Sequence, residues 1–152
     1  MDKSSFSLKD HAADLRLRRV FGITLDEYNI RLAKQNGVCK ICLRPPNKVR
    51  LAVDHDHAFD RIKIKITKLV SGKFHAVANN DDLNVYIMEV NPDRKKLRSM
   101  VHLMLRRMSI RGLLCMNCNR GLQKFYDKPE RFEAAALYLR EFKKKVLGLT
   151  NG

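Results

Sequence analysis

The fold of this chain is decided by the stretch Arg111-Gly112-Leu113-Leu114-Cys115-Met116-Asn117-Cys118-Asn119. Its first four residues predict a short strand, and the Cys-x-x-Cys pair predicts a turn into a helix that ends near Tyr126. A second pair of the same type lies far upstream, at Cys39-Lys40-Ile41-Cys42. Although 72 residues separate the two pairs, together they contain all four cysteines of the chain.

The two pairs predict a structural zinc site whose ligands are Cys39, Cys42, Cys115 and Cys118, because the chain has no secretory signal that would favour disulfides. Four thiolates at about 2.3 Å close a tetrahedral shell and leave no position for a substrate. The long separation is tolerable because loop-closure entropy grows only logarithmically with loop length. Two alternatives remain open at this point: a pair of redox dithiols, and buried cysteines without a metal.

A dense cluster of ionisable residues, Asp54-His55-Asp56-His57, follows a short strand expected over residues 49–53. Side chains alternate along an extended chain, so the two aspartates should point one way and the two histidines the other. A carboxylate that binds a hard divalent cation, beside an imidazole that deprotonates water, performs metal-assisted hydrolysis. Asn119 could supply another oxygen ligand, held in position by the zinc site. The alternatives are a second metal site or a solvated polar turn.

Hydrophobic periodicity predicts helices around small sheets. Helices are expected over residues 8–20, 25–36 and 97–108. Strands are expected over residues 61–69, 74–78 and 83–90. Thr24 and Glu27 form a capping box at the start of the second helix, and Asp127 and Glu130 form another at the start of the last one.

The 152-residue chain is strongly basic, with 31 Lys and Arg against 16 Asp and Glu and a net charge of +15. The basic residues are spread over the whole chain, which predicts a basic body that contacts a phosphate backbone. No apolar run reaches the roughly 18–20 residues of a membrane-spanning helix, and no signal peptide is recognisable. We expect a single domain over residues 1–152. Its parts are N-terminal helices (1–38), a zinc-bound core (39–57 and 111–126), a basic insertion (58–110) and a C-terminal helix (127–152).

Four segments follow one another in a characteristic order along the chain: Gly22-Ile23-Thr24-x-x-x-Tyr28, Cys39-x-x-Cys42, Asp54-His55-Asp56-His57, and Arg111-Gly112-Leu113-Leu114-Cys115-x-x-Cys118-Asn119-x-x-Leu122. This order resembles the phage recombination endonuclease VII family, a branch of the His-Me finger (ββα-metal, HNH-like) nucleases. The resemblance covers about residues 15–57 and 111–140. It implies an α+β fold with a zinc-stapled ββα-metal core flanked by helices. Family members connect the two core strands by a short hairpin, whereas here we expect an insertion of a β-hairpin plus a helix.

The resemblance also implies roles for individual residues. Asp54 and Asn119 would bind a catalytic Mg²⁺ ion, for which Mn²⁺ could substitute, and the Zn²⁺ ion would be structural. His55 would be the general base, and His57 would assist by contacting the scissile phosphate. Leu122 occupies a position where some relatives carry an acidic residue.

We therefore predict a Mg²⁺-dependent DNA endonuclease that nicks DNA or cuts both strands, with branched DNA as one candidate substrate. The residues expected to contact DNA are Arg61, Lys63, Lys65, Arg111 and Arg120. We further expect a homodimer, a phage protein bound by the insertion, no membrane association, and a location in the cytoplasm of the host cell. Two alternatives are a non-catalytic zinc module that binds nucleic acid or recruits a partner, and an HNH homing or packaging-associated nuclease.

Overall fold

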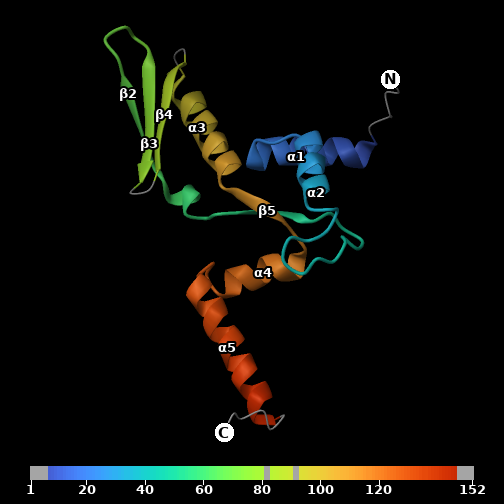
Figure 1. The fold of residues 1–152 in the computed structure, drawn as a ribbon. Coiled ribbons are helices and arrows are strands. Elements are labelled where there is room, and N and C mark those ends of the chain that lie inside the picture. The colour runs from blue at the N-terminus through green and yellow to red at the C-terminus, as the bar shows by residue number, and fades with distance from the viewer. Residues whose placement is uncertain (1–6, 81–82, 91–92, 147–152) are drawn as a thin grey trace.

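The computed structural model of the chain describes residues 7–80, 83–90 and 93–146, so the outer ends of the expected segments 1–38 and 127–152 lie outside it. The elements in chain order are α1 (Leu8–Phe21), α2 (Leu25–Lys34), β1 (Ala52–His55), η1 (Phe59–Arg61), β2 (Lys63–Lys68), β3 (Phe74–Asn80), β4 (Leu83–Val90), α3 (Arg94–Met108), β5 (Ile110–Leu114), α4 (Met116–Lys124) and α5 (Pro129–Val146). In Figure 1, α5 extends from α4 away from the remaining elements. None of the helices within the described ranges has the length and hydrophobicity needed to cross a membrane.

The strands β1 and β5 form a two-stranded antiparallel sheet in which Val53 pairs with Leu113 and Asp54 with Gly112. The register shifts after Asp54, and β5 leads through Cys115 directly into α4, which contacts both strands. The expected strand over 49–53 therefore begins later, at Ala52, and includes Asp54 and His55. Asp54 and His55 are held in the sheet by pairing with β5. This pairing could not be predicted from the local sequence, because β5 lies far along the chain.

The insertion contains three antiparallel strands in the order β2-β3-β4, which confirms the strands expected over residues 61–69, 74–78 and 83–90. The description of this region as a β-hairpin plus a helix therefore omitted one of the three strands. The predicted alternation along β2 is confirmed: Lys63 and Lys65 are exposed, whereas Ile64 and Ile66 pack against the insertion's core. The helix α3 lies beside this sheet (Figure 1) and contacts β2 and β3. The buried core of the insertion consists of Ile62, Ala76, Ala78, Leu97, Val101 and Leu105.

A second core lies around the β1-β5 sheet, with side chains from α1 and α2. Its buried members are Leu17, Ile23, Leu25, Tyr28, Cys39, Leu51, Val53, Leu113 and Leu114. The Tyr28 hydroxyl donates a hydrogen bond of 2.9 Å to the Leu51 carbonyl, which ties α2 to the segment before β1. The predicted capping box is confirmed, since Thr24 and Glu27 each accept a hydrogen bond from the other's backbone N–H. The zinc-ligand candidates thus lie at the edge of a core that α1 and α2 help to build.

The two cores are joined where α3 meets the turn between α1 and α2. Arg107 donates to the Gly22 carbonyl at 2.9 Å and pairs with Glu27, and Arg106 donates to the Val20 carbonyl at 3.3 Å. Gly22 has a φ of 67°, and an added Cβ would lie 3.2 Å from the Leu103 carbonyl oxygen. A glycine is therefore needed at this close approach of α3 to the turn between α1 and α2.

Candidate active site and zinc site

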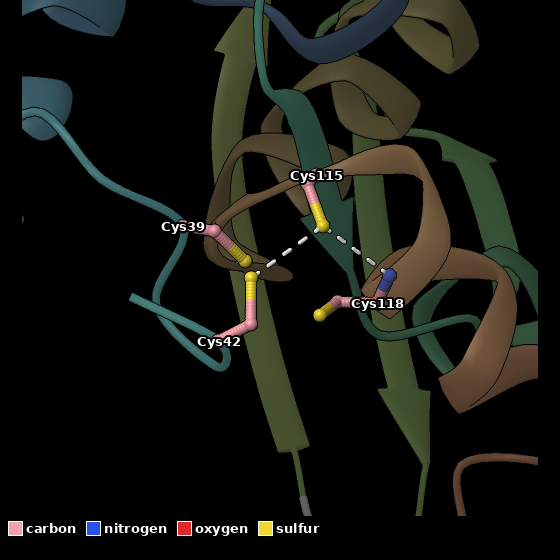
Figure 2. Close-up of side chains that lie close together, drawn as sticks. All are labelled: Cys39, Cys42, Cys115 and Cys118. Atoms are coloured by element: carbon pink, nitrogen blue, oxygen red, sulfur yellow. Dashed lines mark hydrogen bonds between the residues drawn. The ribbon is translucent and has the colours of Figure 1, made fainter. Parts of the chain in front are cut away.

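The four cysteines meet at one place although they come from two distant segments. Their sulfur atoms all lie within 4.8 Å of one another, and Figure 2 shows them pointing toward a common centre. The Cys42 and Cys115 Sγ atoms are 3.8 Å apart. A tetrahedron with bonds of about 2.3 Å has sulfur–sulfur edges of about 3.8 Å, so this spacing fits zinc. These four residues could hold a structural zinc ion, as the sequence predicted.

The thiols of this cluster have very different affinities for protons. Burial raises the pKa of Cys39, but hydrogen bonds from the backbone N–H groups of Cys42, Cys115 and Ile41 outweigh burial and lower that pKa to about 6. Burial and the three neighbouring sulfurs raise the pKa of Cys118 to about 12. One thiolate is thus stabilised at the expense of another, and a divalent cation would allow all four to be ionised.

Local hydrogen bonds bring the two cysteine pairs into contact. Cys115 is the N-cap residue of α4, and the Lys40 N–H donates to the Leu113 carbonyl at 3.2 Å. The Gln35 amide bridges the pairs, because it donates to the Val38 and Leu113 carbonyls and accepts from the Leu113 N–H at 2.8 Å. Sequence analysis did not single out Gln35, since a lone glutamine after a helix carries no recognisable signal.

Asp54 is buried and is paired with Arg111 from the opposite strand. The two guanidinium contacts are 2.8 and 2.9 Å, and the Asp54 side chain is only 9% exposed. Asp127 approaches the same guanidinium at 3.4 Å. Hydrogen bonding to Asp54, and then the charges of Asp54, Asp127 and Asp56, raise the pKa of Arg111. The residue that we expected to bind Mg²⁺ is therefore bound to a cation of the chain itself.

Asp127 was expected to cap the last helix, and this expectation was wrong. It has a φ of 55°, α5 begins at Pro129, and the carboxylate faces Arg111. Its Oδ1 atom is buried and has no hydrogen-bond partner within the described part of the chain. Asp127 therefore places a second acidic side chain beside Asp54, which sequence analysis missed because the two residues are 73 positions apart.

His55 and His57 point the same way, as the alternation predicted, with ring centroids 4.4 Å apart. The Phe21 and His55 rings pack edge to face, with their centroids 5.5 Å apart. Asp56 instead accepts a hydrogen bond from the Ala58 N–H at 2.8 Å, which turns the chain into η1. The histidine pair is thus held between α1 and η1.

Asp60 of η1 was not predicted as a site residue, yet it contacts both histidines. Its Oδ2 atom lies 3.6 Å from His55 Nε2 and 3.4 Å from His57 Nδ1, while Oδ1 lies 3.3 Å from Arg106 Nε. Burial alone would raise the pKa of Asp60, but Arg106, His57 and His55 together lower it. The sequence offered one indication that Asp60 belongs to the site, its spacing of three residues from His57. This spacing is too common to predict a site.

Asn119 and His55 line a common cleft of about 550 Å³ between α1 and β1. Arg16 and Arg50 lie in the same wall. A second cleft of about 500 Å³ is lined by His57, Arg61 and Asp127, among others. Asn119 and His55 therefore share one cleft, and His57 and Arg61 share the other.

The basic residues expected to contact DNA differ in their surroundings. Arg61, Lys63, Lys65 and Arg120 are exposed, and among the described residues none of them has an ion-pair partner. Arg111 is bound to Asp54 and Asp127, so it would have to leave Asp54 before it could contact a phosphate. Four of the five cations are therefore free to approach a nucleic acid.

The family model for recombination endonuclease VII matches residues 14–141, a range that includes the zinc-ligand candidates, the histidine cluster and the whole insertion. The chain belongs to the recombination endonuclease VII family. This confirms the resemblance drawn from the motifs and assigns the chain to the nucleases, with DNA as the class of substrate. Comparisons with curated proteins and with solved structures found no match.

Proposed function

We propose that this member of the endonuclease VII family is a Mg²⁺-dependent DNA endonuclease with a His-Me finger active site. The observation that carries the proposal is the meeting of three features in one ββα arrangement. His55 ends β1, Asn119 lies on α4, and both line one cleft. The start of α4 carries Cys115 and Cys118, whose sulfur atoms meet those of Cys39 and Cys42. A zinc ion bound by those cysteines would hold α4 rigidly against β1, which positions Asn119 relative to His55.

His55 is the proposed general base, which takes a proton from the attacking water. Asp60 contacts its Nε2 atom, so Nδ1 is the nitrogen left for the proton transfer. The Phe21 ring packs edge to face with the His55 ring and restricts its rotation. His57 has the proposed role of contacting the scissile phosphate, and its 46% exposed side chain is open to a substrate.

Asp54 and Asn119 are the proposed ligands of Mg²⁺. Asp54 and Asp127 fit such a cation, because they already surround a positive group, Arg111, and because the buried Oδ1 of Asp127 lacks a hydrogen-bond partner among the residues that the structure describes. The ion, for which Mn²⁺ could substitute, would stabilise the charge that develops on the phosphate and the leaving oxygen. In this proposal, Arg111 releases Asp54 when the ion binds.

The insertion provides the proposed path for the DNA backbone. Arg61 lies in the wall of the cleft that contains His57, and Lys63 and Lys65 continue from it along the exposed face of β2. Arg120 lies beside Asn119 on α4. Replacing Lys63 and Lys65 by Gln should reduce the salt dependence of DNA binding by about one phosphate contact per lysine.

The test of catalysis is the cleavage of supercoiled plasmid by zinc-loaded protein, with and without millimolar Mg²⁺. We expect relaxed or linear product only with Mg²⁺, and the ratio of the two forms distinguishes nicking from paired cuts. His55→Ala should lower the rate by about 100-fold or more, because a general base typically contributes that much. His11→Ala, an exposed histidine on α1, is the matched control and should keep full activity.

Two results would contradict the proposal. Full activity of the His55→Ala variant would remove His55 from the mechanism. An intact plasmid that is nevertheless shifted by the protein, with linear, nicked and branched DNA also uncut, would favour the non-catalytic zinc module. Cleavage at one defined sequence would instead favour the homing or packaging-associated nuclease.

The proposed partners include a second copy of the chain, since one active site per chain cuts two strands most simply as a dimer. Sedimentation equilibrium measures this directly, and a monomer at all concentrations, with and without DNA, would contradict it. A phage protein that binds the insertion is a further proposal, tested by pull-down with the full chain and with a variant that lacks residues 62–109.

A further inference from the structure

His55, His57 and Asp60 bring two imidazole nitrogens and one carboxylate oxygen together, with all three ligand atoms within 4.8 Å of one another. We propose that these residues form a second metal site, distinct from the cysteine cluster and from the Asp54–Asn119 pair, that takes a borderline transition-metal dication such as Zn²⁺. The donors come from β1, from the loop after it and from η1 of the insertion. The site therefore depends on η1, the short helix with which the insertion begins.

Two of the three ligand–ligand distances are close to those that such an ion requires. A tetrahedral shell with bonds of about 2.0–2.1 Å has ligand–ligand edges of about 3.3 Å. The Asp60 Oδ2 atom is 3.4 Å from His57 Nδ1 and 3.6 Å from His55 Nε2. Two nitrogens and one oxygen suit Zn²⁺, Co²⁺ or Ni²⁺, whereas Mg²⁺ prefers a shell of oxygens. The cluster thus selects a different class of ion from the proposed catalytic one.

The surroundings of the three ligands resemble those of a built metal site. Arg106 Nε lies 3.3 Å from Asp60 Oδ1, the oxygen that faces away from the histidines, and also donates from Nη1 to the Val20 carbonyl. Phe21 packs against the His55 ring. Partners of this kind orient ligands and typically change metal affinity by about 10- to 100-fold. The side chains of His57 and Asp60 are 46% and 34% exposed, so an ion can reach the site and keep a solvent ligand.

An ion at this site would bind the Nε2 atom of His55, fix its ring and withdraw charge from it, which makes Nδ1 a weaker proton acceptor. This consequence rests on the proposed function, in which His55 must accept a proton and approach the attacking water. Occupancy should therefore inhibit Mg²⁺-dependent cleavage, although binding of the ion does not depend on any nuclease activity. Binding and cleavage can be measured separately.

The test is a Co²⁺ titration of the full chain after its zinc content has been brought to one equivalent. We expect one further equivalent of Co²⁺ to bind, with visible d–d absorption and without the near-ultraviolet charge-transfer band of a cobalt thiolate. Asp60→Asn and His57→Ala should each weaken this binding by at least about tenfold. Asp56→Asn is the matched control, because it removes an acid adjacent to both histidine ligands while it can keep the Ala58 hydrogen bond.

The result that would overturn the proposal is Co²⁺ binding that is absent, that shows only the thiolate band, or that is equally strong in wild type, Asp60→Asn and His57→Ala. Circular dichroism of each variant excludes unfolding as the cause of weaker binding. Tight binding with no loss of cleavage would leave the metal site in place and would instead contradict the role of His55 as the base. The two proposals can therefore fail separately.

Discussion

Replacing Arg111 by Gln should destabilise the protein and, at the same time, make it a better binder of Mg²⁺. The reason is the pairing of Arg111 with Asp54, whose carboxylate is nearly buried and receives two guanidinium hydrogen bonds. Glutamine keeps most of the length of the side chain but removes its charge. Asp54 would then be a buried carboxylate without a positive partner.

The size of the effect follows from the geometry. Contacts of 2.8 and 2.9 Å place the two charge centres about 4 Å apart, where an effective dielectric constant of about 20 gives an attraction of about 4 kcal/mol. The Arg111 side chain is 35% exposed, so solvent screens part of this attraction. Breaking a fully buried pair costs about 3–5 kcal/mol, and an exposed pair contributes about 1 kcal/mol or less. We expect a loss of about 2 kcal/mol in the free energy of unfolding, or about 4–8 °C in Tm.

The assay is urea unfolding of wild type and Arg111→Gln, each with and without Mg²⁺. In wild type the ion must displace Arg111 from Asp54, whereas in the variant it meets a carboxylate without a partner. A difference of about 2 kcal/mol corresponds to Mg²⁺ binding that is up to about 30-fold tighter in the variant. Mg²⁺ should therefore restore most of the lost stability of Arg111→Gln and change wild type much less.

Arg120→Gln is the matched control, since it makes the same change at an exposed position without an ion pair among the described residues and should stay within about 0.5 kcal/mol of wild type. An Arg111→Gln variant as stable as Arg120→Gln would show that the pair with Asp54 contributes nothing to folding. Equal stabilisation of wild type and Arg111→Gln by Mg²⁺ would separately exclude a competition between Arg111 and the ion for Asp54.

Three further predictions concern the frame around the site. Cys118→Ser should contain less zinc than wild type by elemental analysis and should lose more than about 3 kcal/mol of stability in urea, because a zinc ion held by the four cysteines would join α4 to the distant cysteine pair. An unchanged zinc content would contradict the four-cysteine site. The capping hydrogen bond from the α2 N-cap N–H, followed by an arginine of α3, lowers the pKa of Glu27. Its contribution should therefore be complete above about pH 4.5 and lost as the pH falls through the lowered pKa, so that Glu27→Gln costs about 1 kcal/mol at pH 7 and nothing near pH 2. Equal costs at both pH values in urea titrations would contradict this. Gly112→Ala would put a Cβ 3.2 Å from the Gln35 Oε1 atom and should cost about 1–2 kcal/mol, whereas Gly121→Ala, in open space within α4, should gain about 0.5–1 kcal/mol. Calorimetric Tm values that move in the same direction for both variants would rule out the steric explanation.

Features that depend on neighbouring residues could be predicted from the sequence alone. The capping box at Thr24 depends on a spacing of three residues, and the exposed face of β2 depends on alternation along a few positions. The cysteine pairs could be assigned to one site despite their distance, because four thiols in two close pairs have few other uses in a chain without a secretory signal. The same motifs were sufficient to recognise the family, which the match over residues 14–141 confirms.

The partners of the charged residues were decided by the tertiary structure. Arg111 was expected to face DNA and Asp54 to face a metal ion, but the pairing of β1 with β5 places them against each other. Asp60 and Asp127 became neighbours of the site because η1 and the turn before α5 bring them there. Helix and strand periodicity depends on contacts a few residues apart, which a sequence displays directly. The energy of a charge depends on every group within several ångströms in space. Asp54 and Arg111 are 57 positions apart in the chain, so only folding determines which charges meet.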